Sequence, residues 1–109
     1  MQYDLSHAAL EIREGRESAS SLMELSIAAA QSPLCAHVFS QTFFDSARWA
    51  AAETPRTQPL AGLAVSIKDL FDMQGSRSAA SSKVLRNAPL AESTATAVAR
   101  LQNAGAALI

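Results

Sequence analysis

The feature that most constrains the fold is the apolar run from Leu63 to Ile67, which leads directly into a lysine. Pro59 and Gly62 mark a turn before the run, and the run itself carries a single hydroxyl group. A short apolar run bounded by turn residues is typical of a strand that is buried on both faces in a parallel sheet. The sequence therefore predicts an α/β fold with a strand over residues 63–67.

Alternation along this strand places Lys68 on the same face as Ala64 and Ser66. Small neighbours leave room beside a long side chain, so we expect the Lys68 amine to lie in a cavity and not in water. Removal from water favours the neutral form of an amine, which can then accept a proton from a serine hydroxyl. Lys68 is therefore a candidate general base. The alternative is a solvated lysine at the strand end, paired with Asp69 or Asp72.

Several motifs before, within and after this strand occur in an order that is known from one protein family. They are Pro59-Leu60-Ala61-Gly62-Leu63, Val65-Ser66-Ile67-Lys68-Asp69 with Asp72 and Gly75, Ser82-Lys83-Val84-Leu85, Thr94-Ala95-Thr96-Ala97-Val98-Ala99-Arg100-Leu101, and Ala104-Gly105-Ala106. In this order they resemble the amidase signature family, clearly from Pro59 to Ile109 and more loosely before it. The resemblance implies that residues 1–109 are the N-terminal part of one amidase domain, with a helical lead-in over 1–54 and the start of the core over 59–109.

The expected architecture is α/β, with N-terminal helices packed on the start of a mixed, largely parallel sheet that is truncated in the strand 106–109. A helix that starts at Glu92 or Ser93 joins the two strands. Connections of this kind are right-handed, so strands 63–67 and 106–109 should be neighbours or near neighbours in one sheet. The loop after Lys68 would then lie at the carboxyl end of the sheet, where open α/β sheets place their ligand sites.

The resemblance implies that the parent protein hydrolyses a carboxylic amide by a Ser–cis-Ser–Lys mechanism. In it, Lys68 deprotonates a bridging serine, which in turn activates a nucleophilic serine. Both serines belong to a glycine- and serine-rich segment that this sequence lacks, so we expect residues 1–109 alone to be inactive. Asp69, Asp72 and Ser82 are candidate supporting residues. Ser81 falls where the family more often has glycine.

Two other functions stay open. The amidase-like subunit of a glutamyl-tRNA(Gln)/aspartyl-tRNA(Asn) amidotransferase uses the same chemistry to pass ammonia to a mischarged tRNA, and it keeps the lysine strand. The residues at 68–72 are more similar to those of the free-standing amidases. The third possibility is a non-catalytic, truncated interaction module, which would not need Lys68.

The charge and the cysteine content of the chain indicate which binding partners and which cellular compartment to expect. The net charge is −1 and the basic residues are scattered, so we expect no nucleic acid partner and no anionic membrane. Cys35 is the only cysteine, which favours a reducing compartment such as the cytoplasm. The uncharged run 25–44 contains Pro33 and several polar side chains, so it does not read as a transmembrane helix. We expect a small-molecule amide as substrate, a homodimer as candidate assembly, and no cofactor or metal, since His7 and His37 lack ligand companions.

Helical periodicity predicts three helices and one short strand in the lead-in. The first helix covers residues 6–13, and the second begins with a capping box at Ser21 and Glu24 and stops before Pro33. A strand over 36–40 and a helix over 41–53 follow. The residues expected to pack in the interior are Leu5, Ala9, Leu10, Leu22, Met23, Leu25, Ala29, Phe43, Phe44, Ala47, Ala50 and Ala51, with Trp49 where the third helix meets the sheet. Because alanine supplies much of this surface, we expect a thin core.

Overall fold

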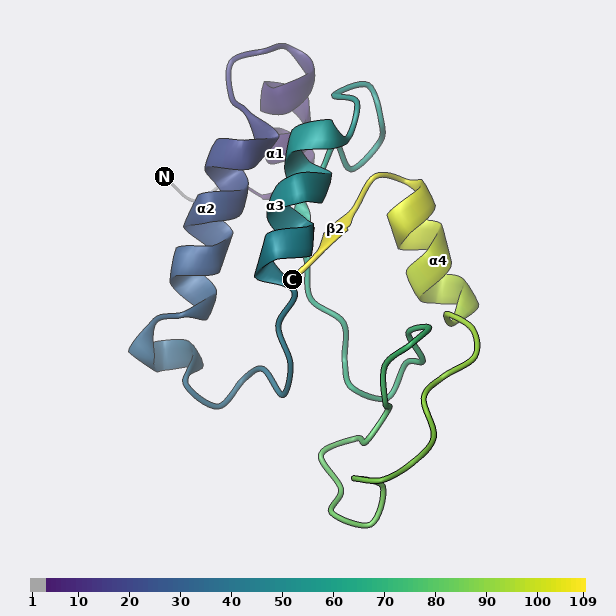
Figure 1. Ribbon diagram of the computed structural model, residues 1–109. Helices are drawn as coiled ribbons and strands as arrows, with labels where there is room; N and C mark the ends of the chain where they lie inside the picture. The colour runs from purple at the N-terminus through teal and green to yellow at the C-terminus, as the bar shows by residue number, and fades with distance from the viewer. Residues whose placement is uncertain (1–3) are drawn as a thin grey trace.

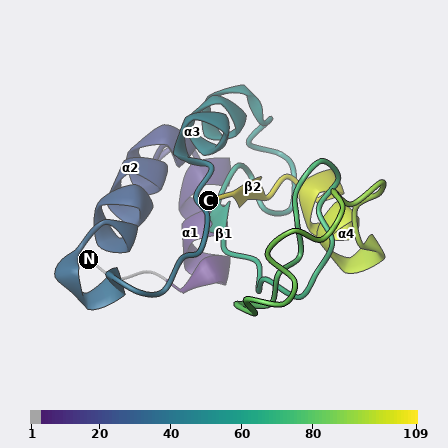
Figure 2. The same cartoon turned by 60° about the horizontal axis from the view of Figure 1, so that its bottom comes forward.

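The computed structural model describes residues 4–109, which form helices on both sides of a short parallel sheet. The elements in chain order are α1 Leu5–Arg13, α2 Ala19–Ala30, the 3₁₀-helix η1 Pro33–Cys35, α3 Phe44–Glu53, β1 Ala64–Val65, α4 Thr96–Asn103 and β2 Ala107–Leu108. Helices α1, α2 and α3 lie on one side of the strands and α4 lies on the other (Figure 1, Figure 2). The predicted α/β class is confirmed.

Strands β1 and β2 pair in parallel, which confirms the predicted pairing. Ala64 lies opposite Ala107, and Val65 lies opposite Leu108. Each strand has two residues, fewer than predicted, because within residues 4–109 these strands pair only with each other. A strand without a second neighbour has few backbone partners, so the ladder ends where the chain turns away.

The approach to β1 depends on Gly62. Its φ is +80°, and a Cβ atom there would lie 3.0 Å from the Cα of Ala51 and 3.2 Å from the Cβ of Ala19. Ala51 belongs to α3, and Ala19 is the first residue of α2. Glycine is therefore needed for the left-handed conformation and for the close approach of the strand to both helices.

The core is built largely from alanine, as the composition predicts. Six of the ten members of its main buried cluster are alanine: the cluster consists of Ala8, Ile12, Ala19, Met23, Ile27, Ala47, Ala51, Ala61, Leu63 and Ala107. Small side chains let α2, α3 and β2 approach each other closely. Each alanine side chain buries little apolar area, so each adds little to the hydrophobic stabilisation of the fold.

The buried faces of α1 and α2 differ from the predicted ones. Ala8 and Ile12 are buried in α1, whereas Leu5 and Leu10 are 54% and 43% exposed. Leu25 of α2 is also exposed. Both helices carry apolar residues around much of their circumference, so the sequence alone does not decide which face is buried. The face that packs in the core is the one that lets the helix backbones approach closely.

The predicted capping box at Ser21 and Glu24 is wrong. Helix α2 begins earlier, with Ser18 as N-cap, and the Ser18 hydroxyl accepts the Ser21 backbone N–H at 3.0 Å. The Glu24 carboxylate instead accepts two hydrogen bonds from Arg48 of α3, from Nε at 2.7 Å and from Nη2 at 3.1 Å. A run of serines offers several equivalent caps, and the earliest one adds a further turn to the helix.

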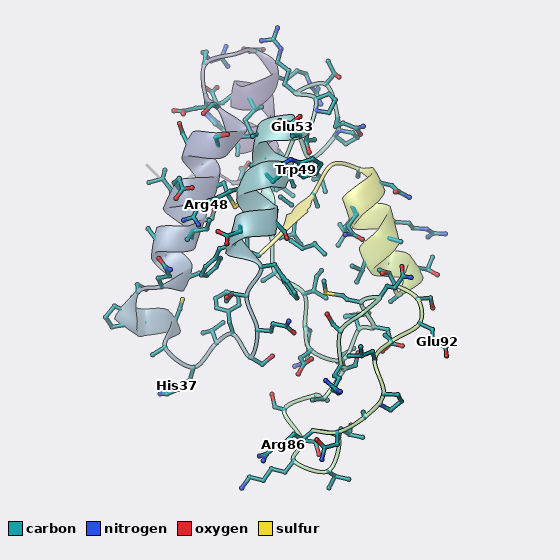
Figure 3. All side chains as sticks on the ribbon, in the orientation of Figure 1. His37, Arg48, Trp49, Glu53, Arg86 and Glu92 are labelled. Atoms are coloured by element: carbon teal, nitrogen blue, oxygen red, sulfur yellow. The ribbon has the colours of Figure 1, made fainter. Side chains whose placement is uncertain are left out.

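The predicted strand over residues 36–40 is absent. The chain passes through η1 and an irregular segment into α3, which begins at Phe44 and not at residue 41. Trp49 does not pack against the sheet: it lies on the outer side of α3 and is 70% exposed (Figure 3). The charged side chains of Asp45, Arg48 and Glu53 are exposed on the same helix.

Helix α4 begins at Thr96, later than the predicted start, and Val98 is its buried residue. It ends before Gly105, whose φ of +93° is the left-handed conformation that commonly ends a helix. The longest helix within residues 4–109 is α2, with 12 residues. No described helix has the length and apolar character needed to cross a membrane.

Candidate active site

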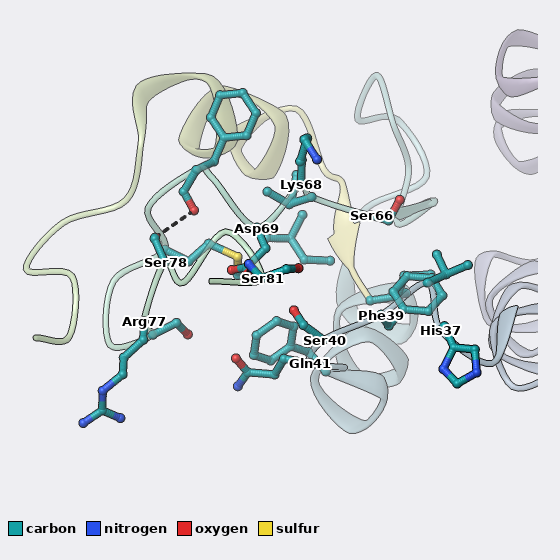
Figure 4. A pocket seen from close by; sticks show the side chains of 18 of the residues that line it. His37, Phe39, Ser40, Gln41, Ser66, Lys68, Asp69, Arg77, Ser78 and Ser81 are labelled. Carbon is teal, nitrogen blue, oxygen red and sulfur yellow. Dashed lines mark hydrogen bonds between the residues drawn. The ribbon is translucent and has the colours of Figure 1, made fainter. Parts of the chain in front are cut away.

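A cavity of about 630 Å³ lies at the carboxyl ends of β1 and β2. Its walls come from three segments, which fall within residues 36–43, 66–81 and 108–109 (Figure 4). The carboxyl ends of parallel strands meet at one edge of a sheet, and open α/β sheets bind their ligands outside that edge. A cavity therefore lies where the sequence predicts a ligand site.

Lys68 lines this cavity just beyond the end of β1. Its carbonyl oxygen accepts the backbone N–H groups of Leu70 at 2.7 Å and Phe71 at 3.1 Å, so the chain turns sharply after the lysine. Within residues 4–109 its ammonium group has neither a hydrogen bond nor an ion pair. An unpaired amine in a cavity wall is able to exchange a proton with a bound molecule.

The expected removal of Lys68 from water is not seen in the described part of the chain. The residue is exposed, and so is Ser66. Lys68 lies three residues beyond the last ladder pair, Val65 with Leu108, where no described element covers it. The alternation of side chains contained no information on what covers the end of the strand.

The two aspartates that follow the lysine hold the loop and do not contact the amine. The carboxylate of Asp69 accepts the Ser81 backbone N–H at 3.4 Å. The carboxylate of Asp72 accepts the Ser78 hydroxyl at 2.6 Å, and its carbonyl oxygen accepts the Ala95 N–H at 2.8 Å. Asp69 lines the cavity, whereas Asp72 is not among the lining residues. Neither carboxylate forms the ion pair with the lysine that the alternative interpretation required.

Residues 79–82 form a tight turn with two consecutive left-handed residues. Ala80 has φ +47° and Ser81 has φ +57°. The Ser82 N–H donates to the Ala79 carbonyl at 2.7 Å, which together with the two positive φ values is the pattern of a type I′ turn. Ser81 lines the cavity. Ser82, the candidate supporting serine, does not line it, and its hydroxyl accepts the Val84 N–H at 3.2 Å.

Sequence reasoning missed the wall formed by residues 36–43. Phe39 and Phe43 are half-buried in it, and Ser40 and Gln41 lie on the side of the cavity that faces Ser81 (Figure 4). The sequence marks this segment only as apolar and uncharged. Its place beside the carboxyl end of β1 follows from the way α3 packs on β2, which local patterns do not report.

The groups with clearly shifted pKa values lie in the lead-in helices, away from the cavity. The hydrogen bond from Arg16 lowers the pKa of Glu11, and the hydrogen bond from Arg48 lowers the pKa of Glu24. The same contact with Glu24 raises the pKa of Arg48. No three His, Cys, Asp or Glu side chains come together as a metal-binding group in the part of the chain that the structure describes.

The sequence model of the family described as Amidase matches residues 22–109. The chain belongs to the amidase family. The match covers most of the chain, and it includes the lysine strand and the cavity loops. The resemblance to the amidase signature family drawn from the motifs of residues 59–109 is confirmed.

A relative of this amidase-family chain and two solved structures that are similar to it extend the finding. AtzE, named as part of the 1-carboxybiuret hydrolase of Pseudomonas sp. (strain ADP), is 47% identical over 51 residues, which are 47% of this chain and 11% of the relative. Two solved structures come from a vestigial protein complex that reveals the evolutionary origins of an s-triazine catabolic enzyme, one of them inhibitor-bound. They superpose with TM-scores of 0.83 and 0.84 at 31% identity over 97% of this chain. The chain spans about a quarter of their length.

Proposed function

We propose that residues 1–109 form the N-terminal part of an amidase that hydrolyses a carboxylic amide, with Lys68 as its general base. The observation that carries the proposal is the position of Lys68: it lines a cavity at the carboxyl end of β1, and its ammonium group has no partner within residues 4–109. A general base has to reach the proton that it removes, and an ion partner would compete with that role. Membership of the amidase family supports the reaction class.

The proposed mechanism is a proton relay through two serines. The neutral amine of Lys68 accepts a proton from the bridging serine, which takes one from the nucleophilic serine as that oxygen attacks the amide carbonyl. The C–N bond breaks when the proton returns to the departing nitrogen, and water then hydrolyses the acyl ester. We propose that both serines lie in the part of an amidase domain that this chain does not span. That part would also withdraw Lys68 from water and so favour its neutral form.

The comparisons favour amide hydrolysis over ammonia transfer to tRNA. The relative AtzE is named as a subunit of 1-carboxybiuret hydrolase, and its name refers to no tRNA. We therefore propose a small-molecule amide as the substrate. A cytoplasmic location and a homodimer are further proposals, which rest on the sequence alone.

Replacing the two lysines of the chain in the whole protein tests this function. Lys68→Ala removes the proton acceptor, so ammonia release from a panel of primary amides should fall about 10²- to 10⁴-fold. Lys83→Ala is the matched control, because Lys83 is exposed and lies outside the cavity. Its activity should stay at the wild-type level. A Lys68→Ala protein that hydrolyses amides as fast as the wild type would refute the assigned role.

The wild-type protein separates the three functions in the same assay. An amidase releases ammonia from free amides without another substrate. Ammonia release that requires a mischarged tRNA and glutamine would show the amidotransferase instead. A whole protein that cleaves no amide under either condition would support the interaction module.

A further inference from the structure

The turn of residues 79–82 needs support from its surroundings. Ala80 and Ser81 both have positive φ values, and residues with a Cβ atom disfavour this region. Glycine, asparagine and aspartate are the residues that type I′ turns favour. This turn has none of them at its two central positions, yet it forms part of the cavity wall.

Asp69 supplies that support with two hydrogen bonds. Its backbone carbonyl accepts the Ala80 N–H at 2.9 Å, and its carboxylate accepts the Ser81 N–H at 3.4 Å. Two consecutive left-handed residues are thus bonded to one aspartate. Asp69 is half-buried, and Figure 4 shows its side chain beside Ser81.

The same aspartate is the neighbour of Lys68 in the sequence. On one side, the Lys68 carbonyl is held by the N–H groups of Leu70 and Phe71. On the other side, the next peptide is held through the contacts of Asp69 with the turn. The direction in which the Lys68 side chain leaves the strand therefore depends on how firmly Asp69 is held.

We propose that Asp69 is a positioning residue, which holds the left-handed turn of Ala80 and Ser81 against the end of β1 and thereby fixes the direction of Lys68. The inference rests on the proposed function, because Lys68 has to be the base for its direction to matter. Asp69 acts by holding the backbone of the turn, and it takes no proton in the reaction. What the position requires is a side-chain oxygen that accepts the Ser81 N–H, not a negative charge.

Steady-state kinetics of the whole protein test this role with the primary amide that the wild type cleaves best. Asp69→Ala removes the side-chain bond to Ser81 and leaves the backbone bond to Ala80, so the turn is loosened and kcat should fall about 10- to 100-fold, as expected when a catalytic group is misplaced by about 1 Å. KM should stay within about threefold, because the residue does not bind the substrate. Asp69→Asn keeps an oxygen acceptor and should retain at least about a third of kcat. Glu92→Ala is the control, because Glu92 is exposed and lies outside the cavity.

A second substitution distinguishes positioning from simple stability. Ser81→Gly in the Asp69→Ala background should recover about fivefold or more in kcat, because glycine adopts the left-handed conformation without support. A merely structural role would lower the melting temperature and leave kcat unchanged well below it.

Three results would overturn the inference. They are an unchanged kcat for Asp69→Ala, no recovery with Ser81→Gly, and a folded Asp69→Asn protein that loses more than about tenfold in kcat. Any of them alongside an inactive Lys68→Ala protein would reject the role of Asp69 and leave the proposed function in place. Full activity of Lys68→Ala would instead reject the proposed function.

Discussion

Ser81 has a backbone conformation that suits glycine better than serine. Its φ of +57° lies in the left-handed region, and the preceding residue, Ala80, has φ +47°. The resemblance of the motifs to the amidase signature family implies glycine more often than serine at the position of Ser81. Here the position is occupied by serine, and the contact with Asp69 helps to hold the turn.

Ser81→Gly should therefore stabilise the protein. The left-handed region costs a residue with a Cβ atom about 1–2 kcal/mol, and the extra entropy of unfolded glycine offsets about 0.5–1 kcal/mol of the gain. The free energy of unfolding of the whole protein in urea should rise by about 0.5–1 kcal/mol. Gly75→Ala is the inverse control: φ is +81° there and no atom lies within 4 Å of the added Cβ, so it should destabilise through conformation alone. A Ser81→Gly protein less stable than the wild type would contradict the description of the turn.

At Lys68 the sequence predicts the place of the side chain but not its surroundings. The apolar run before it indicates a strand, and the carboxyl end of that strand does carry the cavity. The exposure of the lysine depends on elements that cover the strand end, and no local pattern contains that information. The same holds for Phe39 and Gln41, which line the cavity because of tertiary packing.

At the scale of elements, the sequence predicts which segments are helical better than where the helices begin. All four α-helices were expected, and the parallel pairing of β1 with β2 followed from the helical crossover between the two strands. The start of α2 was not, because several serines compete for the cap and tertiary contacts claim the Glu24 side chain. The predicted strand over 36–40 is absent because an apolar run forms a strand only where a neighbouring strand offers backbone hydrogen-bond partners. The apolar pattern of the run does not show whether such a neighbour exists.

The contact between α2 and α3 should make stability depend on pH through Glu24. The hydrogen bond from Arg48 lowers the pKa of Glu24 below its ordinary value of 4.5. A carboxyl group with a lowered pKa in the folded state adds stability above its unfolded pKa and loses it as the pH falls through the folded value. The added stability should thus be complete near pH 7 and lost well below pH 4.5.

Thermal unfolding of the whole protein with Glu24→Gln checks this dependence. At pH 7 the variant should melt slightly below the wild type, by at most about 2 °C, because both side chains are partly exposed. The gap should close as the pH falls to about 3, and it should shrink in 1 M salt, which screens exposed charges. A gap that stays constant from pH 7 to pH 3 would contradict the assignment.

At the scale of the whole molecule, the α/β class and the alanine-rich core were predictable, but several of the side chains expected in the core are exposed. Leu5, Leu10 and Leu25 were expected inside, yet alanine occupies most of the main buried cluster. Periodicity identifies an apolar face only where the opposite face is polar, and these helices carry apolar residues on more than one side. Trp49 was assigned to packing for its size alone, and it is exposed on α3. Its exposed ring shows that size does not decide burial.

The account as a whole depends on Lys68 acting as a base and not merely as a positive charge. Arginine keeps the charge and the length of the side chain but cannot give up its proton in a protein. The decisive measurement is ammonia release from a primary amide by the whole protein carrying Lys68→Arg, with Lys83→Arg as control. We expect Lys68→Arg to lose at least about 10² in kcat, as Lys68→Ala does, and Lys83→Arg to lose nothing. A Lys68→Arg protein that retains most of its activity would show that the site needs only a cation, and the general-base account would be wrong.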